Sequence, residues 1–163
     1  MLKTIVLVTK RLIVRSEFME FIQKLGADFS NEDIVYDGQL YDRTGGYLWI
    51  KYNPEEELSG SELESRVKSI TEKLGSSPQT QILIDIGKNR SSEILAAEFV
   101  TLFSRIWSCI IDDDNSILYS VPEFLEEVGW TPRLQGIANG VSDRPGGGGS
   151  KPVSITTSNL YPR

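Results

Sequence analysis

Hydrophobic and polar positions change between strand-like and helix-like spacing through the first 87 residues. Apolar residues spaced three and four positions apart predict two helices, at about residues 16–25 and 61–74. Other apolar runs are short and rich in β-branched or aromatic residues, as in buried strands. These runs are residues 4–9, 34–36, 47–52 and 81–86.

The elements follow one another in the order β-α-β-β-α-β. That order predicts a mixed α/β (α+β) domain with a ferredoxin-like core, in which an antiparallel sheet carries both helices on one face. Ser16 can cap the first helix, and Ser61 with Glu64 forms a capping box for the second. Gly26 and Gly75 mark the two helix ends.

A third helix, predicted at about residues 92–107, begins an α-β-β-α extension that ends near residue 130. Its sequence is apolar nearly all round, so it has to be covered on several sides. We expect it to lie on the sheet face that the first two helices leave bare. In that position it would cover Tyr47 and Trp49 of the third strand.

The rest of the extension is a short hairpin followed by a last helix. Two apolar runs flank a polar turn, and they predict the two strands of the hairpin at residues 109–111 and 117–119. Ser120 and Glu123 then form a capping box, and Pro122 lies in the first turn. These signals predict a helix that starts directly after Ser120.

The composition removes several classes of enzyme. The chain of 163 residues has no histidine and one cysteine, Cys109. Catalytic triads and dyads that use histidine as the base are therefore excluded, as are zinc sites that need an imidazole ligand. A single cysteine permits neither an internal disulfide nor a cysteine-rich metal site.

Charge is distributed unevenly along the chain. Residues 1–130 contain 13 Lys and Arg against 22 Asp and Glu, a net charge of −9, whereas residues 131–163 carry a net charge of +3. An acidic body repels phosphate backbones and favours encounter with basic proteins, although such a charge also keeps many domains soluble. We therefore expect a basic protein as the partner rather than nucleic acid.

A compositional boundary near residue 130 divides the chain. We expect one α/β domain over residues 1–130, because the last 33 residues hold six of the 14 glycines and four of the seven prolines. Residues 131–150 have the composition of a flexible linker, natural or engineered. Residues 151–163 are a short basic tail with alternating apolar positions. The tail is either a tethered peptide that docks as a strand, in cis or on a neighbouring molecule, or a disordered tag.

The sequence contains no signal for a membrane. No apolar run approaches the roughly 18 residues that a membrane-spanning helix needs. Residues 1–6 lack the long apolar core of a signal peptide. We expect a cytoplasmic protein that does not contact a membrane.

Carboxylates suggest two candidate sites for chemistry. Asp112, Asp113 and Asp114 are the densest group of hard oxygen ligands, but the glycine that a calcium loop requires is absent, and a solvated hairpin turn is the simpler interpretation. Asp85 interrupts an apolar strand, as a general acid or base would, or as an outward-facing residue of an alternating strand would. A metal-dependent enzyme that uses both sites is a third hypothesis. Because the turn interpretation is simpler, however, we expect no bound metal.

The third strand suggests a different function. The segment Gly46-Tyr47-Leu48-Trp49-Ile50-Lys51-Tyr52 resembles the aromatic third-strand signature of RNA-recognition motifs. The resemblance implies a module that binds single-stranded RNA, with Tyr47 and Trp49 as the base-stacking pair and Lys51 beside them. Burial of both rings under the third helix would exclude this function.

The second half of the body supports another resemblance. The helix that contains Ala96-Ala97-Glu98-Phe99 leads through the acidic turn Asp112–Asn115 to Ile117–Ser120 and a last short helix. In this succession of elements and in its acidic α/β body, the chain resembles immunity proteins of bacterial toxin systems. These are small inhibitors that neutralise contact-dependent or other polymorphic toxins. The resemblance implies binding and inhibition of a basic toxin, without catalysis.

We therefore predict an immunity-type protein-binding inhibitor with no enzymatic activity and no cofactor. Acidic residues would attract the basic partner, and aromatic side chains would anchor it. The candidate contacts are Asp112, Asp113, Asp114, Glu55, Glu56, Glu57, Tyr41 and Tyr119. The alternative is the RNA-binding module built on Tyr47, Trp49 and Lys51.

Overall fold

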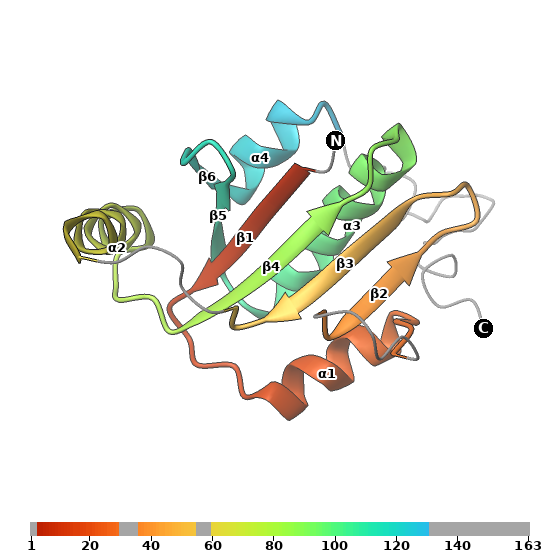
Figure 1. The fold of residues 1–163 in the computed structure, drawn as a ribbon, viewed down its shortest axis with the longest axis horizontal. Coiled ribbons are helices and arrows are strands. Elements are labelled where there is room, and N and C mark those ends of the chain that lie inside the picture. The colour runs from red at the N-terminus through yellow and green to blue at the C-terminus, as the bar shows by residue number, and fades with distance from the viewer. Residues whose placement is uncertain (1–2, 30–35, 55–59, 131–163) are drawn as a thin grey trace.

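The computed structural model describes residues 3–29, 36–54 and 60–130. Over these residues the chain forms a six-stranded antiparallel sheet and four helices (Figure 1). The strands are β1 (Lys3–Thr9), β2 (Gly38–Tyr41), β3 (Tyr47–Tyr52), β4 (Thr80–Ile86), β5 (Cys109–Asp113) and β6 (Leu118–Ser120). The helices are α1 (Arg15–Lys24), α2 (Gly60–Leu74), α3 (Arg90–Ile106) and α4 (Val121–Glu127). The mixed α/β class is confirmed.

The strand order differs from that of the predicted ferredoxin-like core. The order is β2-β3-β4-β1-β5-β6, with every neighbouring pair antiparallel. A ferredoxin-like core places β3 beside β1, but here β4 lies between them. Pairing Leu48 with Ile86 and Ile50 with Ile84 continues one apolar surface from β3 onto β4. Local sequence spacing predicted the elements but did not contain this long-range pairing.

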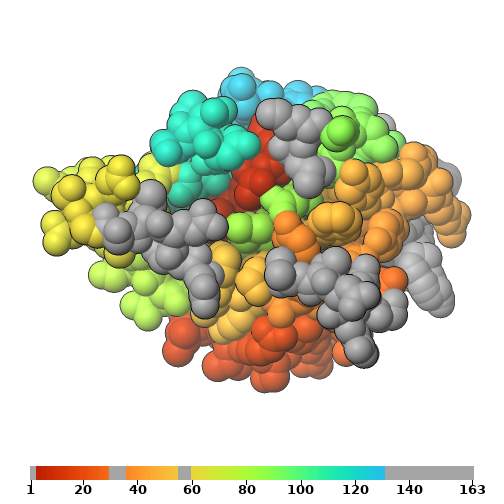
Figure 2. Space-filling model, in the orientation of Figure 1, coloured from red at the N-terminus to blue at the C-terminus, as the bar shows by residue number. Residues whose placement is uncertain are grey.

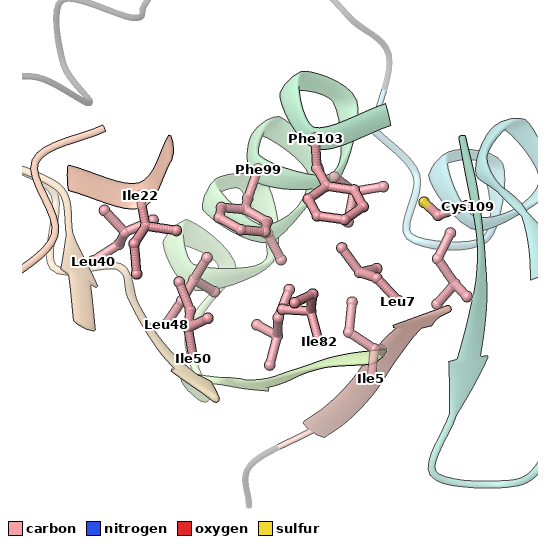
Figure 3. Packing of buried hydrophobic residues seen from close by; sticks show 14 of the residues in the cluster. Ile5, Leu7, Ile22, Leu40, Leu48, Ile50, Ile82, Phe99, Phe103 and Cys109 are labelled. Atoms are coloured by element: carbon pink, nitrogen blue, oxygen red, sulfur yellow. The ribbon is translucent and has the colours of Figure 1, made fainter. Parts of the chain in front are cut away.

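The main core lies on the face of the sheet that we call the helix-covered face. Side chains of directly paired residues in antiparallel strands share a face, so Ile5, Ile84 and Ile50 point together toward α1 and α3. Phe99 and Phe103 of α3 fill the space above them and are fully buried (Figure 3). Burying each such ring stabilises the fold by about 1.5–3 kcal/mol.

The prediction for the third helix was wrong in one respect. Helix α3 lies on the same sheet face as α1, behind the sheet in Figure 1, whereas α2 lies on the opposite face. The apolar circumference of α3 is covered by the sheet, by α1 and by α4, whose Phe124 joins the same core. The third helix therefore does not cover Tyr47 and Trp49, which alternate with the core residues Leu48 and Ile50.

Helix α2 packs on a small second core. Ile70 contacts Val8 of β1 and Ile110 of β5, and the three residues are buried. The prediction that both early helices share one face was therefore wrong. Most of the α2 surface is exposed, and it covers the β1, β5 and β6 side of its face.

Several local predictions are confirmed with shifted boundaries. The β5–β6 hairpin and helix α4 form as expected, and the Ser120 capping box with Glu123 is complete. The first hairpin forms between β2 and β3, and its first strand is Gly38–Tyr41; of the strand predicted at residues 34–36, Tyr36 is described and precedes β2, and the rest lies outside the described residues. Helix α1 begins after Val14, and no side chain caps it, so Ser16 is not its cap.

The predictions for the linker at 131–150 and the tail at 151–163 fall outside the described residues. Within the described ranges, none of the helices has the length and apolarity needed to cross a bilayer.

Candidate functional site

The three consecutive aspartates have different environments. Asp112 forms an ion pair with Arg66 of α2, and both side chains are largely buried. The Oδ1 atom of Asp113 accepts hydrogen bonds of 2.9 Å from the backbone N–H groups of Asn115 and Ile117, so this carboxylate holds the β5–β6 turn. Asp114 is exposed. Of the predicted acidic cluster, Asp114 is the residue whose carboxylate faces solvent.

Two ion pairs join α2, the β5–β6 turn and α4 into one surface. Arg66 also donates a hydrogen bond of 3.2 Å to the carbonyl of Ser116 in the turn. Lys73 of α2 pairs with Glu123 of α4 at 3.0 Å. The pKa of Glu123 is lowered, first by the backbone of its cap Ser120 and then by Lys73. In Figure 2 these elements, coloured yellow, teal and blue, occupy adjoining parts of the surface.

This surface, which we call the acidic end, collects most of the exposed negative charge of the described residues. Its exposed carboxylates are Glu62, Glu64, Glu72, Asp114, Glu123, Glu126 and Glu127, against the exposed lysines Lys68 and Lys73. The other described residues show the reverse balance, with two exposed acidic side chains and eight exposed basic ones. Exposed charge is therefore segregated by sign.

Two apolar side chains lie exposed within the acidic end. Val67 of α2 is 39% exposed and Ile117 of the turn is 48% exposed. Protein interfaces combine an apolar centre with a charged rim, and these two side chains supply apolar surface among the carboxylates. Tyr119 does not, because its ring packs on Phe124 with centroids 6.3 Å apart.

Of the remaining predicted contacts, Tyr41 is not part of the acidic end. Tyr41 is 50% exposed, but it lies on β2, at the opposite edge of the sheet from β6. Its hydroxyl donates a hydrogen bond to Gln39. Glu55, Glu56 and Glu57 lie outside the described residues. Asp114 and Tyr41 therefore lie on two separate surfaces.

The second candidate surface is the sheet face opposite α1 and α3, which we call the aromatic face. A row of paired residues crosses four strands on this face: Gln39, Trp49, Asp85 and Thr4. Tyr47 and Lys51 lie on the same face of β3, two residues to either side of Trp49. Among the described helices, α2 packs on this face, and it covers β1, β5 and β6 rather than β2 and β3.

Asp85 is the buried charge at the centre of that row. Its side chain accepts hydrogen bonds from the hydroxyls of Thr4 and Tyr36. Burial raises the pKa of Tyr36 to about 12, and the hydrogen bond and charge of Asp85 add to the effect. Tyr36 is therefore protonated at neutral pH and acts as a donor. Asp85 faces away from the main core, as the outward-facing alternative expected, but it is buried there, with 8% of its surface exposed.

Three aromatic rings lie beside Asp85. The ring of Trp49 has its centroid 5.3 Å from that of Tyr36 and 6.0 Å from that of Tyr47, and all three side chains are half-buried. The Nε1 atom of Trp49 is buried without a hydrogen-bond partner. The aromatic third strand thus keeps its rings together on a face that α3 does not cover.

The described residues offer no arrangement for metal chemistry. No group of three or more Asp, Glu, Cys or His side chains within the described ranges could hold a metal ion. Asp85 and Asp112 lie on different strands with different partners, Tyr36 and Arg66. The metal-dependent hypothesis therefore gains no geometric support from these residues.

The sequence analysis missed several residues of both surfaces. Glu126, Glu127, Val67 and Ile117 belong to the acidic end, and a count of charge by element would have indicated the two glutamates, since α4 has no basic residue. Tyr36 was placed in a strand, and nothing in the local sequence indicated its contact with Asp85, 49 residues away.

Comparison with protein-family models, with curated proteins and with solved structures gives no match to this chain.

Proposed function

We propose that this chain is an immunity-type, protein-binding inhibitor that neutralises a basic toxin by covering it with the acidic end. The observation that carries the proposal is the segregation of exposed charge onto α2, the β5–β6 turn and α4. A clustered charge steers an oppositely charged partner toward one surface, which a uniformly acidic protein does not do.

The anchors proposed here are apolar side chains inside the charged rim. Charge raises the association rate, whereas desolvated side chains near the centre of an interface carry most of the affinity. Val67 and Ile117 are the exposed apolar residues of the acidic end. Tyr119 is committed to packing on Phe124, so we move the anchoring role from Tyr119 to these two residues.

The test is capture by the full chain from a lysate of its source cells, with nuclease treatment and a salt series. The variant Asp114→Lys/Glu126→Lys reverses two charges of the acidic end. The control Glu17→Lys/Glu20→Lys makes the same change in net charge on α1, where both carboxylates form exposed ion pairs of little energetic value.

We expect a basic protein that survives nuclease treatment, that is lost in the Asp114→Lys/Glu126→Lys variant and that is retained by the control. The captured protein should then lose its toxic activity when the chain is added in equimolar amount. Equal capture by the two variants would refute the acidic end as the interface. A captured protein whose activity is unchanged would refute inhibition.

The second candidate function is binding of single-stranded RNA on the aromatic face. It is favoured by the position of Tyr47 and Trp49, since their rings lie on the face opposite α3. Bases stack on such rings with little regard to sequence, and each stack contributes about 1–3 kcal/mol. The net charge of −9 over residues 1–130 opposes this function, because phosphate attraction supplies most non-specific affinity.

The RNA hypothesis is tested by titration with uridine and adenosine oligonucleotides while tryptophan fluorescence is recorded. Binding on the aromatic face requires quenching in the wild type and weaker quenching in Trp49→Phe. The variant Trp130→Phe controls for a tryptophan outside β3. Unchanged fluorescence at low salt would exclude the hypothesis.

A further inference from the structure

Asp85 has an unusual combination of burial and charge. It lies on β4, with β1 on one side and β3 on the other, and it is 8% exposed. Its Oδ1 atom accepts a hydrogen bond from Thr4 and its Oδ2 atom accepts one from Tyr36. Both donors are neutral hydroxyl groups. The carboxylate is thus hydrogen-bonded, but its negative charge is not balanced by these partners.

No arginine or lysine among the described residues forms an ion pair with Asp85. An uncompensated buried charge is unfavourable, so its presence calls for an explanation. A carboxylate offers about four acceptor positions, two on each oxygen. Thr4 and Tyr36 use one position on each oxygen. One position on each oxygen therefore remains, and a guanidinium fork uses one acceptor position on each oxygen of a carboxylate.

The surroundings of Asp85 also match a guanidinium group. Trp49 is the direct cross-strand partner of Asp85, and Tyr36 contacts both Asp85 and the Trp49 ring. A guanidinium is planar, stacks on aromatic rings and is more weakly hydrated than an ammonium group. An alkylammonium group would gain the charge attraction, but it would make neither the bidentate hydrogen bonds nor the planar stacking contact of a guanidinium. The site therefore distinguishes between the two cations.

We propose that Asp85, Tyr36 and Trp49 form a recognition site for the guanidinium group of an arginine side chain supplied by the basic partner. This inference rests on the proposed function. The site adjoins the acidic end, since Thr4 pairs with Asp85 and Val6, on the same face of β1, pairs with Asp112, the ion-pair partner of Arg66 in α2. A partner steered to the acidic end is thus within reach of Asp85.

The test uses methylguanidinium as the probe and the full chain without any partner protein. The reporter is the indole N–H resonance of Trp49 in a ¹H–¹⁵N spectrum, identified by its absence in Trp49→Phe. We expect a saturable shift, with affinity in the millimolar range that suits so small a ligand. Methylammonium at the same ionic strength should bind at least about tenfold more weakly, because it lacks the bidentate contact.

Variants separate the role of the Asp85 carboxylate in binding from its role in folding. Asp85→Asn should weaken methylguanidinium binding by about tenfold or more, since a charge-assisted hydrogen bond is lost. Glu20→Gln makes the same change from carboxylate to amide at an exposed position on α1 and should bind as the wild type does. If Asp85→Asn does not fold, Tyr36→Phe tests the site. This variant removes the hydroxyl that donates to Asp85 and leaves the negative charge of Asp85 in place. That variant should retain the preference for methylguanidinium.

The outcomes distinguish this inference from the proposed function. An absent shift, an equal affinity for methylammonium, or an unchanged affinity in Asp85→Asn would each overturn the arginine site. Capture of the basic protein through the acidic end would still stand in those cases. Conversely, saturable binding of methylguanidinium with no protein captured would keep the site and refute the immunity-type function.

Discussion

Gly87 determines where the Tyr47 ring of the aromatic face lies. A Cβ atom at this position would be 2.6 Å from Cε1 of Tyr47 and would also meet the Ser92 hydroxyl. Ser92 in turn accepts a hydrogen bond of 2.9 Å from the backbone N–H of Tyr47. The start of β3 and the first turn of α3 therefore approach each other at a position that only glycine permits.

We expect Gly87→Ala to lower the free energy of unfolding by about 1–3 kcal/mol, the usual cost of overpacking. The measurement is a urea titration, in which the midpoint should fall at constant slope. A double-mutant cycle with Tyr47→Ala should give a coupling of at least about 0.5 kcal/mol, because the two positions contact each other. Additive effects would show that the ring is not the obstacle.

Cys109 makes stability depend on pH in the alkaline range. Burial raises the pKa of its thiol from the ordinary 9.0 to about 12. The unfolded chain releases this proton near pH 9, so rising pH favours the unfolded state until the folded thiol also titrates. The contribution is complete below pH 9 and is lost as the pH rises toward 12.

Between pH 8 and pH 10 we expect this thiol to lower the free energy of unfolding by about 1.4 kcal/mol. Urea titrations at pH 8, 9 and 10 measure the effect. The comparison is with Cys109→Ala, whose pH profile should be flatter by that amount although its stability at pH 8 also differs. Parallel profiles for the two proteins would contradict the prediction.

Residue types alone predicted the structural role of some residues but not of others. Asp85 was recognisable as a carboxylate in an apolar strand, and Ser120 with Glu123 as a capping box, because both signals are local in the sequence. The hydroxyl partners of Asp85 come from Thr4 and Tyr36, which are 81 and 49 residues away. Their contact with Asp85 depends on the strand order, so it was not predictable without that order.

The β5–β6 turn shows how one acidic run serves two purposes. Asp113 is 8% exposed and accepts two backbone hydrogen bonds across the turn, whereas Asp114 is exposed. Losing a carboxylate that satisfies backbone donors leaves those donors without a partner. The two neighbours therefore differ in structural role although both are aspartates.

We expect Asp113→Ala to lower the free energy of unfolding by about 1–2 kcal/mol and Asp114→Ala to change it by less than about 0.5 kcal/mol. Thermal and urea unfolding of the two variants, which carry the same net charge, measure the difference. Equal losses would mean that the turn does not depend on the Asp113 carboxylate.

At the scale of elements, sequence spacing predicted most strands and helices but not their arrangement. The alternation of Tyr47 and Trp49 with Leu48 and Ile50 correctly indicates two faces of one strand. It does not specify which helix covers which face, because that depends on long-range contacts that local spacing does not contain. The position of β4 between β1 and β3 is likewise determined by long-range strand pairing and not by local propensity.

For the whole molecule, the distribution of charge matters more than its sum. The net charge of −6 for the chain describes many soluble proteins and by itself specifies no partner. The described residues gather their exposed carboxylates on the acidic end and their exposed basic side chains elsewhere. Charge per element could have been counted from the sequence. The contiguity of α2, the turn and α4 could not, because it rests on the contacts of Arg66 and Lys73.

The extent of the folding unit gives a last prediction. The main core cluster draws its buried residues from Ile5 to Phe124, and the backbone N–H of Trp130 closes the end of α4 by a hydrogen bond of 3.0 Å to the carbonyl of Leu125. We therefore expect a fragment of residues 1–130 to unfold with the same midpoint and the same slope in urea as the full chain, since the slope follows the surface exposed on unfolding.

Comparison of the two proteins also decides between the two interpretations of residues 151–163. A strand docked in cis would add buried surface, so its removal would lower the midpoint and the slope together. A strand docked on a neighbouring molecule would make the midpoint of the full chain rise with protein concentration, because association stabilises the folded state by mass action. Identical curves at every concentration would leave the tail without a structural role, and removing residues 131–163, with their net charge of +3, should then speed association with a basic partner at low salt.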